Sequence, residues 1–280
     1  MNKPATERAE GPSRWIGTPR WHLWDGGFAV LGRSEGVVPP HEHHAIQIVV
    51  AVEGTFGIRG ERDDWRSGAG VIVTPDVVHS FDGNSAIGMM VFVDPESAEG
   101  VWLKTSVREH ITVVPDARVA RCAAELRRFI DHPLDSLEIG DLIRHCVQAL
   151  CAGAPPSRRL DERVTRVLEA IRGADELRMS IDDAAALAFL SPSRFAHLFK
   201  QQVGLPFRRY MLWRKLTRAM LVIGRDHTIS TAAHEADFAD AAHLTRTFYQ
   251  MFGIPPSVMM RGEFFEIPSP FDVFTSAHAR

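Results

Sequence analysis

Short apolar runs separated by turn residues fill the first third of the chain, from about residue 15 to residue 94. Residues 45–52 are almost continuously apolar and end at a Glu-Gly pair, and residues 70–74 end at a Pro-Asp pair. Runs of this kind are typical of β-strands. Because a strand that is apolar on both faces must be covered on both, the pattern predicts an all-β barrel or sandwich with further elements packed on its outer face.

Two amphipathic helices are predicted directly after these strands. Apolar positions recur at three- and four-residue steps over residues 117–130 and again over 137–150, with Asp131-His132-Pro133 between the two stretches. Packing on the sheet accounts for most of this apolar stripe, and part of it is a candidate homodimer surface. Residues 151–157 follow as a predicted linker, because Pro155-Pro156 does not continue a helix.

The rest of the chain has helical periodicity with short breaks. Predicted helices span residues 160–172, 181–187, 192–203, 207–223, 230–236 and 241–252. Ser180 begins a capping-box pattern, Ser191 precedes a proline at a first helical position, and Asp240 can cap the last long helix. The sequence therefore predicts an all-α second region.

This helical region contains an internal repeat. Ala184-Ala185, Phe199, Gly204 and Pro206 recur as Ala232-Ala233, Phe248, Gly253 and Pro255, offset by 48 residues before the turn and 49 after it. Each copy is interpreted as a short helix with small residues, a tight turn, a second helix and a Gly-hydrophobic-Pro stop. Small residues let the second helix cross the first closely, as in a helix-turn-helix whose second helix enters a DNA major groove.

Composition indicates a globular protein without a membrane anchor or a disulfide framework. The 280 residues, 45% hydrophobic and 24% charged, suit about two domains. No stretch approaches the roughly 20 apolar residues of a membrane helix, and the N-terminus lacks the apolar core of a signal peptide, so a cytoplasmic location is expected. Cys122, Cys146 and Cys151 form no CxxC pair and are interpreted as small apolar residues of helices.

Charge is divided unevenly along the chain. Residues 157–262 hold 16 Lys and Arg against 11 Asp and Glu, a balance of +5, whereas the remainder holds 16 against 24, a balance of −8. A basic C-terminal part joined to an acidic remainder favours an anionic partner for the basic part.

Residues 160–262 resemble the DNA-binding domain of the AraC/XylS family of bacterial transcription regulators. The matching stretches are residues 191–200 with 204–210, the connecting 213–221, and 238–248 with 252–257. The resemblance implies two helix-turn-helix units that read successive major-groove segments of a double-stranded DNA operator. It also implies that the long helix over residues 207–223 holds the two units one DNA turn apart.

The resemblance assigns contacts residue by residue. Base edges are assigned to Ser193, Arg194 and His197 on the first reading helix and to Ala242, His243 and Arg246 on the second. Arginine can pair with guanine through two hydrogen bonds. The opposite helix faces, with Phe195, Leu198, Phe199, Leu244 and Phe248, are predicted core. Candidate phosphate contacts are Lys200, Arg209, Arg214, Lys215 and Arg218, with a merely solvated charge as the alternative for each.

Both turns depart from the glycine that the family usually carries. This chain has Phe189 in the first turn and Asp237 in the second. Aspartate tolerates a left-handed backbone, but phenylalanine does not do so readily, so the first turn is expected to be distorted.

Histidines in the β region suggest an effector site. His41, His43 and Gln47 have strand spacing that places them on one face, and His79 is expected to join them from another strand. Their order resembles the two cupin motifs, with glutamine in place of the usual metal-binding glutamate. This set is a candidate site for a divalent transition metal, although no cofactor is certain; the alternative is an organic effector hydrogen-bonded by the same residues.

These features predict a two-domain protein: an all-β cupin-like barrel with appended helices, then an all-α double helix-turn-helix DNA-binding domain. The predicted boundaries are 15–115 for the effector-sensing domain, 116–150 for a helical dimerisation segment, 151–157 for the linker and 158–265 for the DNA-binding domain. The expected function is a sequence-specific transcription regulator, not an enzyme, controlled by a small molecule or metal. Expected partners are operator DNA, an effector and a second copy of the chain, with RNA polymerase a further candidate. The alternative is a metal-dependent cupin enzyme with a DNA-binding tail.

Overall fold

A computed structural model describes residues 14–24, 27–107, 109–131, 135–151, 160–267 and residue 270. Most of the predicted linker, residues 152–157, lies outside the described residues. The strands are β1 Arg14–Trp24, β2 Gly27–Glu35, β3 Val37–His41, β4 Ile46–Glu53, β5 Phe56–Gly60, β6 Arg66–Gly68, β7 Gly70–Val73, β8 His79–Asp82, β9 Ile87–Val93, β10 Ile111–Val113 and β11 Glu263–Glu266. The helices are α1 Ala98–Ser106, α2 Asp116–Asp131, α3 Ser136–Leu150, α4 Glu162–Arg172, α5 Ile181–Leu187, α6 Pro192–Val203, α7 Phe207–Gly224, α8 Ile229–Glu235, α9 Ala241–Phe252 and the 3-10 turn η1 Pro256–Arg261.

Two sheets form the β domain. The larger has the order β10-β7-β4-β9-β2-β1-β11 and the smaller β3-β8-β5-β6. The near-continuous apolar run of β4 serves both faces of its sheet: Val49 faces the barrel interior, whereas Ile48 and Val50 belong to the core beneath the appended helices. The predicted all-β domain with two covered faces is therefore confirmed.

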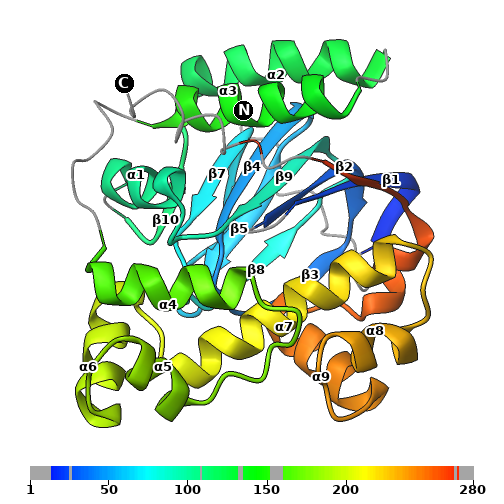
Figure 1. Ribbon diagram of the computed structural model, residues 1–280. Coiled ribbons are helices and arrows are strands. Elements are labelled where there is room, and N and C mark those ends of the chain that lie inside the picture. The colour runs from blue at the N-terminus through cyan, green and yellow to red at the C-terminus, as the bar shows by residue number, and fades with distance from the viewer. Residues whose placement is uncertain are drawn as a thin grey trace.

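Helices α2 and α3 cover the outer face of the large sheet (Figure 1). Their apolar stripes are buried against it, with Leu126 and Ile143 at 0% exposure. Cys122 and Cys146 are buried, unpaired thiols of the same core, as expected for small apolar residues. Asp135 caps α3 through a capping box with Glu138. Packing on the sheet thus accounts for the stripes.

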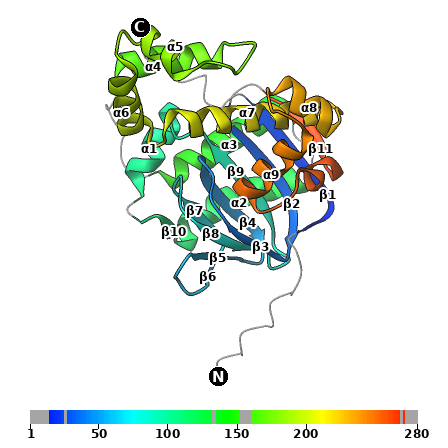
Figure 2. The same cartoon turned by 90° about the horizontal axis from the view of Figure 1, so that it is seen from below.

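The C-terminal helices begin and end close to the predicted positions, and three of them match to the residue: α5, α6 and α9. Figure 2 shows α7 running along the β domain, with α8 and α9 against the sheets and α4–α6 set to one side. No helix within the described ranges is both long and apolar enough to traverse a lipid bilayer.

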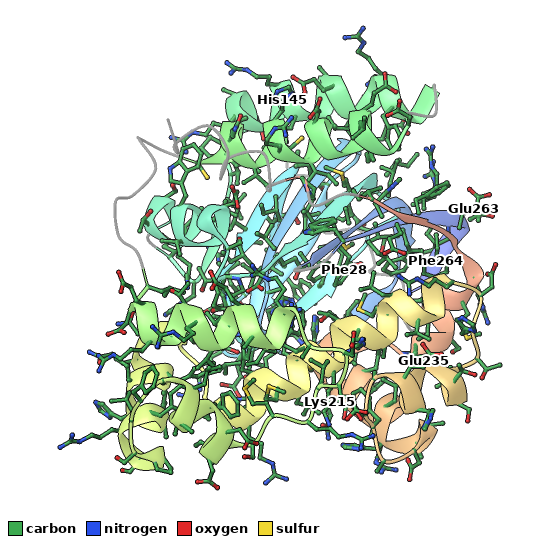
Figure 3. The ribbon with its side chains drawn as sticks, viewed as in Figure 1. Phe28, His145, Lys215, Glu235, Glu263 and Phe264 are labelled. Carbon is green, nitrogen blue, oxygen red and sulfur yellow. The ribbon has the colours of Figure 1, made fainter. Side chains whose placement is uncertain are left out.

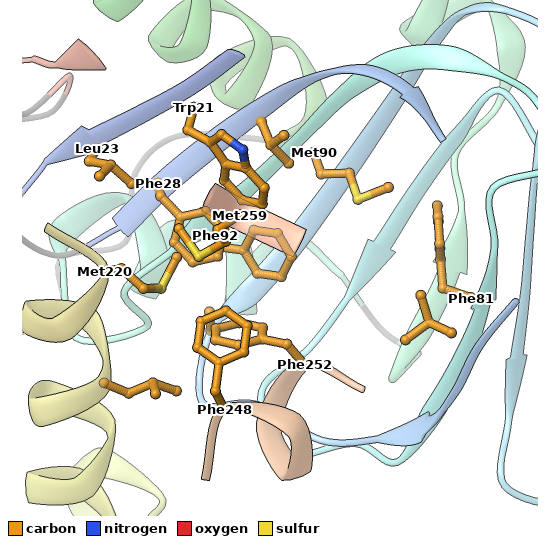
Figure 4. Packing of buried hydrophobic residues seen from close by; sticks show 14 of the residues in the cluster. Trp21, Leu23, Phe28, Phe81, Met90, Phe92, Met220, Phe248, Phe252 and Met259 are labelled. Carbon is orange, nitrogen blue, oxygen red and sulfur yellow. The ribbon is translucent and has the colours of Figure 1, made fainter. Parts of the chain in front are cut away.

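The two helical units pack on different neighbours. The first, α4–α6, has a core of its own that includes Val164, Phe195 and Phe199. The second, α8–α9, shares one core with the barrel interior, where Phe248 and Phe252 lie beside Phe28 and Phe92 (Figure 4).

Strand β11, which the sequence pattern did not predict, ties the second unit further to the β domain. It pairs in parallel with β1, so that the chain returns to the large sheet after η1. Phe264 of this strand stacks on Trp21 with ring centroids 6.3 Å apart and lies above α7 (Figure 3). Gly262 fits here because a Cβ would lie 2.4 Å from Trp21.

Candidate functional site

The two reading helices have the same local design. Pro192 occupies the first turn of α6, and Gly204 ends it with a φ of 100°. Asp240 caps α9 by accepting a hydrogen bond from the His243 backbone N–H at 2.6 Å, and Gly253 ends it with a φ of 66°. Glycine takes this left-handed conformation without steric cost, so the Gly-hydrophobic-Pro motif stops both helices.

The residues assigned to base edges lie on the outer faces of these helices. Ser193, Arg194 and His197 are exposed on α6, and Ala242 and Arg246 are exposed on α9. His243 is half-buried, with its ring edge against Phe238 at 5.2 Å. The predicted core faces are buried at Phe195, Phe199, Leu244 and Phe248, and Leu198 is half-buried.

The expected distortion of the first turn is wrong. Phe189 adopts a φ of 55° and Asp237 a φ of 58°, and both turns close with equivalent backbone bonds. Leu190 N–H donates to Ala185 at 2.9 Å in the first, as Phe238 N–H donates to Ala233 at 2.8 Å in the second.

Different side-chain contacts support the two left-handed residues. Phe189 is 82% exposed, so its ring meets no crowding, and the Arg166 guanidinium lies 5.3 Å from the ring centroid. Asp237 instead accepts a hydrogen bond from Leu177 N–H at 2.8 Å and pairs with Arg178. Phenylalanine therefore takes the left-handed conformation at some energetic cost but without distortion.

The five candidate phosphate contacts divide by their surroundings. Lys200 is exposed, and Arg209 is exposed but pairs with Glu42 of the β domain. Lys215 donates to the Asp237 carbonyl at 2.8 Å and so binds the second turn to α7. Arg218 donates to the Ala174 carbonyl at 3.2 Å and so binds the α4–α5 connection to α7.

Arg214 corrects the sequence prediction. Its side chain is buried on the face of α7 that meets the β domain, and Nη1 lies 4.0 Å from Oδ2 of Asp94, itself 1% exposed. An arginine so placed is not available to a DNA phosphate in this arrangement. Helical periodicity alone did not reveal this, because α7 packs against both helical units and the β domain.

The histidine cluster converges, but its members do not lie along one strand as the spacing predicts. His41 lies on β3, His43 follows in the β3–β4 connection, and His79 lies on β8 directly opposite His41. One ligand atom from each of these buried rings lies within 4.8 Å of the others. Gln47 of β4 reaches the same point, with Oε1 3.2 Å from Nε2 of His43 and 3.0 Å from Nε2 of His79.

Backbone carbonyls fix the tautomers of the three rings. Each Nδ1 donates to a carbonyl two residues away: His41 to Pro39 at 2.9 Å, His43 to Ala45 at 3.1 Å and His79 to Val77 at 2.8 Å. Burial, together with the neighbouring His79, lowers the pKa of His41 to about 3, and burial also lowers the pKa values of His43 and His79. The rings are therefore neutral near pH 7, and their Nε2 lone pairs face one another.

This set of groups fits a divalent transition metal. Metal-bound histidines commonly donate their second ring N–H to a carbonyl, as all three do here. Three Nε2 lone pairs and Oε1 of Gln47 are all acceptors, so either a cation lies among them or the amide turns its NH₂ toward two of the rings.

A cavity of about 60 Å³ adjoins the cluster. It is lined mainly by apolar side chains, with Ser34, His41 and Gln47 as polar members. Phe248 and Phe252 of α9 form part of its wall, and the Phe252 ring lies 6.1 Å from the His43 ring. Since one water needs roughly 10–15 Å³ by this measure, the cavity has room for a few waters or a small ligand group.

Sequence reasoning missed a second buried cluster, which is centred on His44. Nδ1 of His44 lies 3.0 Å from Asp76, and Nε2 lies 3.2 Å from Glu96. Burial alone would lower the pKa of His44, but the Glu96 and Asp76 carboxylates outweigh it and raise that pKa above its ordinary value. Its position next to His43, on the other face, was the available signal.

Comparisons with known proteins agree with this architecture. Residues 184–262 match the helix-turn-helix domain family. The probable transcriptional regulator LumQ of Photobacterium leiognathi is 24% identical over 230 residues, which cover 78% of this chain and 90% of that protein. The arabinose operon regulatory protein of Escherichia coli is 31% identical over 107 residues, which cover 37% of this chain and 36% of that protein.

Solved structures are similar in fold. The crystal structure of ToxT from Vibrio cholerae O395 has a TM-score of 0.52 and 10% identity, and the match covers 80% of this chain and 92% of that one. The similarity extends over the β-rich region and the helical region alike, so the two-domain fold class is confirmed.

Proposed function

Because this chain is a DNA-binding transcription regulator of the AraC/XylS family, we propose that a ligand bound at His41, His43, Gln47 and His79 controls its hold on operator DNA. The observation that supports this most is the cluster itself: three neutral imidazoles whose Nε2 atoms converge beside Gln47, in a cavity partly walled by the second reading helix. Buried polar groups grouped at one end of an apolar cavity are typical of ligand sites.

The donor set favours a divalent transition metal as the ligand or as part of it. Imidazole nitrogens suit Zn, Ni, Fe and Mn to different degrees, and a neutral set of ligands leaves a bound ion its full charge, with which it can hold an anionic group. The four residues would hold the ion, and the carbonyl-bound Nδ1 atoms would keep the rings oriented.

An organic effector is the second candidate, and the apolar cavity wall supports it. A structure of ToxT, similar to this chain in fold, was solved with an unsaturated fatty acid bound. With about 60 Å³ available, a fatty acid enters only if the cavity widens.

For DNA, we propose base contacts from Ser193, Arg194 and His197 on α6 and from Ala242, His243 and Arg246 on α9. Lys200 and Arg209 remain proposed phosphate contacts, with Arg209 released from Glu42 on binding. Lys215 and Arg218 retain this role only if their bonds to backbone carbonyls open. Dimerisation is proposed through the outward faces of α2 and α3, where Leu137 is 68% exposed.

The test measures metal content and operator binding together. An operator is recovered by binding-site selection from random duplex DNA, and its affinity is measured with Zn²⁺ and with a chelator. For a metal site, wild-type protein binds one Zn²⁺ per chain and His41→Ala/His43→Ala binds none, while His145→Ala on the exposed surface of α3 behaves as wild type (Figure 3).

Three other outcomes are informative. An effector response that survives chelation but is lost in the double variant identifies an organic ligand. A response unchanged in the double variant removes the cluster from the effector site. Stoichiometric iron with substrate turnover would support the cupin-enzyme alternative instead.

A further inference from the structure

The short connection His41–His44 has two faces that point to different parts of the molecule. His41 and His43 turn inward to the barrel site, where their rings are 5.8 Å apart. Glu42 and His44 turn outward to α7, the helix that joins the two helix-turn-helix units. Residues that bind the ligand therefore alternate along the chain with residues that contact the DNA-binding domain.

The outward contacts meet the first half of α7. The Glu42 carboxylate accepts a hydrogen bond from Nη2 of Arg209, a proposed phosphate contact. The His44 ring lies edge-on to Tyr210 and Trp213, with centroids 6.2 and 6.4 Å away. Hydrogen bonds from both ring nitrogens of His44 to Asp76 and Glu96 fix the orientation of the ring against α7.

We propose that this connection couples the ligand site to the DNA-binding domain. A ligand that draws His41 and His43 together moves Glu42 and His44 on the opposite face. This movement changes the contacts of the β domain with α7, including the ion pair with Arg209. The coupling rests on the proposed effector site, but the contact that carries it is independent of any ligand.

Chain geometry supports this coupling. Neighbouring side chains of this short connection share one backbone, so a shift of the inward rings is passed to the outward side chains. The segment is also anchored, because the His43 carbonyl accepts a hydrogen bond from Asp76 N–H at 3.0 Å. A small movement of the histidine rings therefore rotates the connection about this hydrogen bond rather than shifting it as a whole.

Glu42 and a DNA phosphate compete for the same guanidinium. The side chains of Glu42 and Arg209 are 35% and 49% exposed, and a pair this exposed is weak. A modest change at the ligand site is therefore enough to shift Arg209 between the acidic β domain and the DNA backbone.

Glu42→Gln in the full chain tests the contact without a ligand. Freed Arg209 should raise operator affinity about two- to fivefold. It should also steepen the dependence of log affinity on log salt by about 0.9, the value for one further phosphate. The matched control is Glu61→Gln, which removes the same charge from an exposed turn of the β domain. Equal effects of the two substitutions would overturn the proposal, since general charge repulsion would then explain both.

A second measurement tests whether Glu42 couples Zn²⁺ binding to operator binding. In wild-type protein, Zn²⁺ changes operator affinity by some factor, and linkage requires the operator to change Zn²⁺ affinity by the same factor. In Glu42→Gln the Zn²⁺ affinity without DNA should stay within about twofold of wild type, while this factor moves toward one. The control Arg208→Gln, which removes an exposed charge beside Arg209 on α7, should leave the factor unchanged. An unchanged factor in Glu42→Gln counts against transmission through this residue.

His44→Gln examines the buried half of the outward face. Its fold is checked first by thermal unfolding, since His44 is 3% exposed. In a folded variant the coupling factor should fall further than in Glu42→Gln. If wild-type protein binds no Zn²⁺, the metal form of the proposed function fails, whereas the result of Glu42→Gln without ligand still decides whether the β domain holds Arg209.

Discussion

The two helix-turn-helix units repeat one sequence pattern but belong to different bodies. In the first unit, Phe199 is buried among residues of α4, α6 and the start of α7. In the second, the equivalent Phe248 is buried among residues of the barrel, and β11 fastens the chain to the large sheet. Only the second unit therefore borders the cavity next to the histidine cluster.

The two units therefore have similar local structure but different packing neighbours. Similar sequence produced equivalent turns and equivalent glycine C-caps in both units, although only Asp240, and not Ser191, caps its helix through the side chain. It did not produce equivalent neighbours, because the partner of an apolar face depends on distant parts of the chain. The first unit packs as a body with its own core, whereas the second packs together with the β domain.

The largest expected effect comes from the equivalent phenylalanines. Phe199→Ala and Phe248→Ala should each cost about 3–5 kcal/mol of stability, since both side chains are almost fully buried. In hydrogen exchange measured by mass spectrometry, Phe199→Ala should raise exchange within residues 160–211 alone. Phe248→Ala should raise it in α8, α9 and strands β1 and β2. Unchanged exchange in β1 and β2 would show that the second unit is independent of the barrel.

The outer faces of α6 and α9 should each set the base preference at a different position of the operator. Arg194→Ala and Arg246→Ala should each relax preference at one base pair, in opposite halves of the operator, at a cost of about 1–3 kcal/mol against the cognate base. Lys200→Ala should weaken all sequences alike, because a phosphate contact carries no sequence information. Binding-site selection on the three variants provides the measurement. A uniform loss for Arg246→Ala would remove its assignment as a reader.

Acid should destabilise the body that contains the second unit through His22. Burial, with Arg20 nearby, lowers the pKa of His22 to about 4, and no hydrogen-bond partner for its ring occurs among the described residues. A histidine with a lowered folded pKa contributes stability above its unfolded value of 6.5, and this is lost as pH falls toward 4. Between pH 7 and pH 5 the loss is about 2 kcal/mol.

The variant His22→Phe isolates this contribution, because the ring already lies between Phe129 and Phe265. Urea unfolding at both pH values should show that wild-type protein loses about 2 kcal/mol more than the variant. Equal losses would mean that His22 is not neutral in the folded protein.

The smallest effect concerns the two left-handed turn residues. Phe189→Gly should stabilise the first unit by about 1 kcal/mol, because it relieves the left-handed strain and removes an exposed ring. Asp237→Gly should destabilise by about 1 kcal/mol, because it removes the acceptor for Leu177 N–H and the partner of Arg178. Thermal unfolding of both variants tests the opposite signs.

Local sequence patterns were enough to predict most helices and the membership of the histidine cluster. Helical periodicity fixed α5, α6 and α9 to the residue. These helices depend on the backbone period of 3.6 residues, which acts over a few neighbours and is therefore visible in any short stretch. The members of the histidine cluster, His41, His43, Gln47 and His79, were also predicted, but they come from β3, the β3–β4 connection, β4 and β8 rather than from one face of a single strand.

Which surfaces meet depends on the tertiary fold and was not predicted from local patterns. The fold buried Arg214 beside Asp94, added β11 to the sheet and placed the second unit in the barrel core, and it gave His44 its carboxylate partners. An arginine has a long apolar stem and a charged head, so its sequence position fits a phosphate contact and a buried pair equally well. The choice between them depends on charges that lie more than a hundred residues away in the chain, and only the folded chain brings those charges together.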